Sequence, residues 1–177
     1  MAECFLAGEE IHRLNRDLRI LVATNGTLTR ILGVVADEEI VVQIIEQQIH
    51  SWETAESRQP SAGRTLRRRV LLNGGESGRR FVAAESLIAV DLLPDAISAL
   101  LTSTQCPIGE IMAAGCLETF KEPAEVWTGE PPDWLVTAES HTLLPRIVGR
   151  RYRIIMGGQP VMTVTEYFLH FFQGVSP

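Results

Sequence analysis

Two strand-like runs joined by a two-glycine turn constrain this fold more than any other feature of the sequence. The runs at 150–156 and 160–172 flank Gly157-Gly158, an arrangement typical of a tight β-hairpin. A second hairpin is indicated where the runs at 65–72 and 80–90 flank the glycine-rich stretch 73–78. Because hairpins join antiparallel neighbours, the sequence predicts a mostly antiparallel sheet.

Apolar residues at helical spacing predict a helix over residues 8–23. Proline near the start of an apolar stretch favours two further helices, over 94–102 and 107–114. The short stretch 27–32 is ambiguous. We expect these helices to pack on the sheet, which makes the fold class α+β.

The remaining patterns complete the expected order of elements. Residues 39–49 are rich in Val and Ile and predict a strand, and 117–127 contains a further strand interrupted by proline. Polar or proline-containing stretches at 51–63 and 130–145 predict a loop and an irregular segment. A length of 177 residues without a linker or repeat predicts one domain over 1–177, with about six strands.

Two charged residues occupy apolar faces of predicted strands. Side chains of a strand alternate between faces, so Glu166 lies in phase with Val164 and Phe168, and Arg68 lies in phase with Val70. A buried charge is costly unless it is paired or binds a ligand. Two interpretations stay open at this point: a structural ion pair, formed between these two residues or with others, or a buried functional site.

Two weaker features also favour an anionic ligand. Pro107 at a helix start leaves the N–H groups of Ile108 and Gly109 free to receive a carboxylate, although an ordinary helix start explains the same pattern. Arg30 is a further candidate, although most such arginines lie on the surface. The arginine clusters at 67–69, 79–80 and 150–153 are interpreted as solvated strand faces. A net charge of −6 argues against a nucleic-acid partner.

Other site types are not indicated. The three cysteines have no metal or disulfide spacing and the four histidines are scattered, so no metal site is expected. The glycine-rich stretches lie in hairpin turns rather than before helices, which argues against a nucleotide cofactor. We recognise no signal-peptide pattern and no long apolar run, and therefore expect a cytoplasmic protein with reduced cysteines and no membrane insertion. Lys121 is the one lysine, and the other basic residues are arginines.

Short motifs in a fixed order carry a resemblance to a known family. They are Thr27-Leu28-Thr29-Arg30, the strand 66–72 with Arg68, Pro107-Ile108-Gly109, Arg150-Arg151-Tyr152-Arg153, Gly158-Gln159-Pro160 and Thr165-Glu166-Tyr167-Phe168-Leu169. In order and spacing they resemble chorismate pyruvate-lyases, of the actinobacterial type that makes 4-hydroxybenzoate.

The resemblance implies a six-stranded antiparallel sheet with helices on it and an internal ligand cavity. It implies conversion of the substrate chorismate to 4-hydroxybenzoate and pyruvate, without a cofactor. By position, Arg68 would clamp the ring carboxylate, and the backbone N–H groups of Leu28 and Ile108 would complete that carboxylate site. Glu166 would face the ring hydroxyl and the ether, and would assist proton transfer.

The sequence departs from the family pattern in two places. Many members carry arginine where Ala84-Glu85-Ser86 falls, and this chain has Glu85. The segment 130–145 is longer than in compact members, and we favour a surface loop over a lid. No residue for the enolpyruvyl carboxylate is identified, although Arg30 is one candidate.

Two alternatives remain open beside the lyase. The same fold serves as a non-catalytic domain that senses aromatic acids in transcription regulators, but the 26 residues before Thr27 hold about one helix, too few for a DNA-reading domain. An enzyme giving another hydroxybenzoate isomer is the other alternative. A cavity within one sheet needs no second subunit, so we expect a monomer, with a dimer as the alternative.

Overall fold

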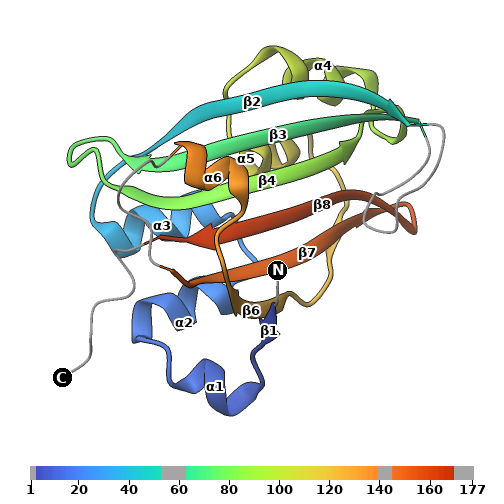
Figure 1. Ribbon diagram of the computed structural model, residues 1–177. Coiled ribbons are helices and arrows are strands. Elements are labelled where there is room, and N and C mark those ends of the chain that lie inside the picture. The colour runs from blue at the N-terminus through green and yellow to red at the C-terminus, as the bar shows by residue number, and fades with distance from the viewer. Residues whose placement is uncertain (1–2, 53–62, 139–144, 170–177) are drawn as a thin grey trace.

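The computed structural model describes residues 3–52, 63–138 and 145–169. They form an α+β fold around one antiparallel sheet (Figure 1). The strands are β1 (Cys4–Phe5), β2 (Ile40–Trp52), β3 (Gly63–Gly74), β4 (Arg80–Ala89), β5 (Phe120–Lys121), β6 (Glu125–Gly129), β7 (Ile147–Met156) and β8 (Gln159–Phe168). The helices are α1 (Gly8–His12), α2 (Arg16–Ala23), α3 (Leu28–Ala36), α4 (Asp95–Ser103), α5 (Ile108–Ala114) and α6 (Asp133–Ala138), with a 3₁₀ turn, η1, at Val90–Leu92.

The predicted number of strands is wrong, because the sheet of the described residues has eight strands in place of six. Its order is β1-β6-β7-β8-β4-β3-β2, with β5 beside β7. The two additional strands, β1 and β5, have two residues each. Two residues cannot display an alternating pattern, so only their backbone pairing with β6 and β7 identifies them.

Both predicted hairpins are present and set the register of the sheet. Gly157 and Gly158 join β7 to β8 with φ angles of +57° and +79°, a conformation in which glycine meets no steric penalty. This hairpin places Arg150 directly opposite Glu166. The β3–β4 hairpin places Arg68 opposite Ser86. The sequence alternation therefore predicted the correct faces for both charged residues.

The amino-terminal helix differs from its prediction. The expected helix over 8–23 is divided into α1 and α2, because the Asn15 side chain accepts a hydrogen bond of 2.8 Å from the Leu18 N–H and begins a new helix. Asparagine favours this capping role over a helix interior. In the ambiguous stretch 27–32, Thr27 is the N-cap of α3 and residues 28–32 form its first part.

Two further expectations meet the limits of the described residues. The segment 130–145 was expected to be irregular, but it contains α6, and its residues 139–144 lie outside the described ranges. The loop expected over 51–63 falls mostly on residues 53–62, which also lie outside them, as do residues 170–172 of the last predicted strand.

Helices cover the two faces of the sheet unequally. Helices α2 and α3 pack on one end of one face around Leu32 and Phe168, and α4 and α5 pack on the other end of that face around Leu101 and Met162. Helix α6 packs on the opposite face through Leu135, which is fully buried, and lies in front of the sheet in Figure 1. Between the two helix pairs, the first face carries the polar residues of the candidate site.

Candidate active site

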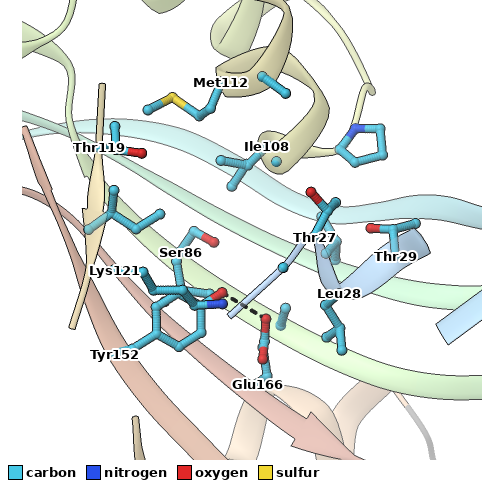
Figure 2. Close-up of a pocket in the computed structure, with 18 of the residues that line it drawn as sticks. Thr27, Leu28, Thr29, Ser86, Ile108, Met112, Thr119, Lys121, Tyr152 and Glu166 are labelled. Carbon is cyan, nitrogen blue, oxygen red and sulfur yellow. Dashed lines mark hydrogen bonds between the residues drawn. The ribbon is translucent and has the colours of Figure 1, made fainter. Parts of the chain in front are cut away.

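A pocket of about 330 Å³ opens on the sheet between α3 and α5. Strands β3, β4, β7 and β8 form its floor, and most of its lining is apolar. Among the described residues, its charged lining side chains are Arg68, Lys121 and Glu166. Figure 2 shows the last two of these. A mostly apolar pocket of this size with a few convergent polar groups is typical of a site for a small molecule.

Glu166 is held in one orientation by two neighbours on β7. One carboxylate oxygen accepts a hydrogen bond from Arg150 Nε. The other accepts one of 2.9 Å from the Tyr152 hydroxyl, the dashed line in Figure 2. The residue is 4% exposed. Burial, reinforced by the carboxylate, raises the pKa of Tyr152 well above its usual value, so the phenol stays a hydrogen-bond donor. The ion pair considered from the sequence exists, but its arginine is Arg150 and not Arg68.

Arg150 is the buried residue that the sequence interpretation missed. It was grouped with Arg151 and Arg153 as part of a solvated face, yet it is fully buried. Its Nη1 donates to the carbonyl oxygens of Leu21 at 2.5 Å and Thr24 at 3.0 Å, and so satisfies the end of α2. Arg150 alternates in phase with Val148 and Tyr152, and the parity argument used for Arg68 would have found it.

Arg68 lacks a carboxylate partner among the described residues. It is 1% exposed, and Nη2 donates 3.0 Å to the Cys106 carbonyl oxygen, while Nε and Nη1 are buried without a hydrogen-bond partner. Burial lowers the pKa of Arg68, the direction expected when a cation is desolvated without a counter-charge. A buried guanidinium of this kind has free donors for an anionic ligand.

The first turns of α3 and α5 meet at the rim of the pocket. Leu28 and Ile108 are the first residues of these helices, both line the pocket, and neither helix start has a side-chain cap. Gly109 permits the close approach, because a Cβ there would lie 2.8 Å from Cγ2 of Thr27. The structure thus brings together all four residues predicted for the site: Glu166, Arg68, Leu28 and Ile108.

Lys121 also reaches this pocket, and sequence reasoning did not assign it a role. Its Nζ lies 3.8 Å from the centre of the Tyr152 ring. Burial, together with the nearby Arg150, lowers the pKa of Lys121 to about 8. The signal in the sequence was compositional: one lysine among sixteen basic residues.

Three other residues or segments discussed from the sequence lie away from the pocket. Arg30 is exposed and does not line it. Glu85 points to the opposite face of the sheet, where it pairs with Arg69 at 2.7 Å, so this departure from the family pattern does not alter the pocket directly. Helix α6 covers that opposite face as well, so the described part of 130–145 is not a lid over this pocket.

Neither a metal site nor a membrane-spanning helix is indicated in the part of the chain that the structure describes. Within residues 3–52, 63–138 and 145–169, no cluster of three or more His, Cys, Asp or Glu side chains could hold a metal ion. In the same ranges, no helix is long and apolar enough to cross a bilayer.

Comparison with known proteins gives a consistent result. The family model described as "Chorismate pyruvate-lyase Rv2949c-like" matches residues 22–174. A chorismate pyruvate-lyase of Mycobacterium leprae (strain TN) is 60% identical over 166 residues, which cover 93% of this chain and 79% of that protein. A chorismate pyruvate-lyase of Mycobacterium tuberculosis (strain H37Rv) is 54% identical over 174 residues, covering 96% and 87%.

A likeness to a solved structure concerns the fold alone. A GntR-family transcriptional regulator from Bacillus cereus superposes with a TM-score of 0.58 at 12% identity, covering 79% of this chain and 96% of that one.

Proposed function

Because the chain belongs to the Rv2949c-like chorismate pyruvate-lyase family, we propose that it converts chorismate to 4-hydroxybenzoate and pyruvate in the pocket that joins Arg68 to Glu166. One observation carries the assignment of this pocket. Arg68 is a buried cation with two unused donor nitrogens, on the same sheet face as a buried carboxylate. A planar guanidinium matches a carboxylate better than any other side chain does.

The substrate would bind with its ring carboxylate on Arg68. The N–H groups of Leu28 and Ile108, at the starts of α3 and α5, would complete that carboxylate site, as predicted from the sequence. The ring would then lie across Ala84 and Val164, small and apolar lining residues of the central strands. This orientation directs the far side of the ring toward Glu166.

The reaction requires a proton transfer and one bond cleavage. The hydroxyl-bearing ring carbon loses a proton, the neighbouring C–O ether bond breaks with its electron pair on the enolpyruvyl oxygen, and the ring becomes aromatic. A proton delivered to the enolpyruvyl group then gives pyruvate. Glu166 is the group we assign to accept and return this proton, a contribution typically worth about 100- to 10,000-fold in rate.

The surroundings of Glu166 suit this task. Arg150 and Tyr152 bind one carboxylate oxygen each and fix the plane of the group. Both contacts are made within the protein itself, which is the arrangement expected for a preorganised site. A pocket built on one sheet and its own helices needs no second subunit for this mechanism, so a monomer is part of the proposal. The three free cysteines are exposed, in keeping with the proposal of a cytoplasmic protein.

The decisive experiment mixes purified protein with chorismate and separates the products by chromatography. Formation of 4-hydroxybenzoate and pyruvate in equal amounts is the expected result. Glu166→Gln, which keeps the shape of the side chain, should reduce turnover by about 100-fold or more. Product at no more than the spontaneous rate would contradict the assignment, and binding of 4-hydroxybenzoate without turnover would favour an aromatic-acid-binding domain. A product with a different retention time would indicate another hydroxybenzoate isomer.

A further inference from the structure

Chorismate carries two carboxylates, one on its ring and one on its enolpyruvyl side chain, and Arg68 accounts for one of them. We propose that Lys121 binds the enolpyruvyl carboxylate, at the end of the pocket away from Arg68. The inference rests on the proposed function and assigns the second charge of the same substrate.

Strand β5 positions Lys121 in the pocket. Lys121 is paired with Ile154 on β7, and Ile154 also lines the pocket. Its neighbours point the other way: Phe120 is exposed, and Glu122 forms an exposed ion pair of 2.7 Å with Arg153. The Glu122 N–H also donates 3.0 Å to the Arg153 carbonyl oxygen. Lys121 is therefore the residue through which this short strand contributes to the pocket.

The sheet register separates the two cations. Arg68 pairs with Ser86, Ser86 with Val164, and Val164 with Tyr152, so one row crosses β3, β4, β8 and β7. Three strand spacings correspond to about 14 Å between the ends of this row. Lys121 lies over the Tyr152 ring at the far end (Figure 2). Since both side chains extend into the pocket, a ligand between them meets one positive charge at each end.

The charge balance of the site favours a dianion. Glu166 and Arg150 neutralise one another, and both Glu166 oxygens already accept hydrogen bonds, from Arg150 and Tyr152. Glu166 lies near enough to favour the charged form of Lys121, but it already pairs with Arg150, and Lys121 forms no ion pair within the described ranges. Among the described pocket residues, Arg68 and Lys121 remain as two unmatched cations facing two carboxylates.

The position next to Glu166 fits the chemistry. In Figure 2, Lys121 and the Tyr152 hydroxyl lie on one side of Glu166, and Leu28 lies on the other. The enolpyruvyl group departs beside the carbon that loses its proton, so its carboxylate must lie at the Glu166 end of the pocket. Thr119, two residues before Lys121, also lines the pocket and offers a hydroxyl.

The test compares a ligand with two carboxylates and a ligand with one. In Lys121→Gln, we expect KM for chorismate to rise at least about tenfold, the usual consequence of losing one charge-assisted hydrogen bond. The affinity for 4-hydroxybenzoate, measured by calorimetry, should stay unchanged because that product has only the ring carboxylate. Lys121→Arg should restore part of the chorismate KM.

Arg68→Met is the matched control, because it should weaken both ligands. An unchanged KM in Lys121→Gln, or an equal loss of affinity for 4-hydroxybenzoate, would overturn the proposal. Thermal melting of each variant separates a loss of folding from a loss of binding. If the wild-type protein turns over no chorismate, the proposed function fails rather than this assignment, and the two outcomes are distinguished by that first measurement.

Discussion

Arg68 and Arg69 are neighbours on β3 and point to opposite faces of one sheet. Arg69 pairs with Glu46 at 2.6 Å and with Glu85 at 2.7 Å, and its guanidinium lies 5.2 Å from the centre of the Trp134 ring. Arg68 is more deeply buried and has one carbonyl contact. The contrast shows that an unmatched charge, rather than a buried or crowded one, distinguishes the site from the scaffold.

Pocket volume alone would place the site on the other face of the sheet. The face that carries Arg69 has a hollow of about 450 Å³ beside α6, larger than the pocket of about 330 Å³ beside α3 and α5. The two arginines in that larger hollow are paired, Arg69 as above and Arg151 with Glu3 at 3.0 Å. Its charged groups therefore have fewer unused donors for an anion, and volume alone is a poor guide to the site.

The largest effect is expected where charge is both buried and paired. Arg150→Met leaves Glu166 buried without its cation, which should lower the free energy of unfolding by about 3–5 kcal/mol. Urea denaturation measures this loss. The double variant Arg150→Met with Glu166→Gln should recover part of it. A single variant as stable as the wild type would show that the pair is not structural.

Arg68→Met should separate binding from stability. Removing an unmatched buried cation costs the fold little, so the melting temperature should hold or rise. The binding free energy of 4-hydroxybenzoate should weaken by about 1.5–3 kcal/mol, or roughly 10- to 150-fold in affinity, because a charged hydrogen-bond donor is lost. Calorimetry and thermal melting on the same sample provide both values. If Arg68→Met unfolds easily but binds 4-hydroxybenzoate normally, Arg68 stabilises the fold and does not bind the ligand.

A pH series tests the pocket face through Lys121. With its pKa lowered to about 8, Lys121 is charged below pH 8 and loses its charge above it. The value of kcat/KM for chorismate, which reports the free enzyme, should therefore fall by up to about tenfold as pH rises through 8.

The groups that face the Lys121 ammonium are Tyr152, Arg150 and Glu166, and the raised pKa of Tyr152 keeps the phenol protonated in this range. Lys121→Gln is the control and should show no fall near pH 8. The same fall in that variant would assign the titration to another group.

The smallest effect is expected on the opposite face. Arg69→Met removes a half-buried pair of contacts to Glu46 and Glu85, which should cost about 1 kcal/mol or less of stability. Because this side chain points away from the pocket, kcat/KM for chorismate should equal that of the wild type. A large loss of activity with normal folding would show that the two faces are coupled through β3.

The sheet face to which each site residue points could be predicted from the alternation of side chains along the strands. This alternation placed Arg68 and Glu166 on the correct face, because strand parity depends only on the chain itself. The residue that pairs with Glu166 could not be predicted in this way. Choosing Arg150 over Arg68 depends on which strands are neighbours, and the order β7-β8-β4-β3 is set by tertiary packing.

Two other differences have local causes. The division of the first helix depended on one capping residue, Asn15, against a continuous apolar spacing that favoured a single helix. Lys121 lies on a strand of two residues, too short for any periodic signal.

The order of the strands bears on how the protein reaches its folded state. Strand β8 comes last among the described elements, yet it lies between β4 and β7 inside the sheet. Arg150 contacts Leu21, 129 positions away. Contacts between such distant parts of the chain have a high entropic cost of loop closure. We expect slow, cooperative folding in which the carboxylate site forms with the final closure of the sheet. During synthesis, the β4 edge therefore stays unpaired until β8 has been made.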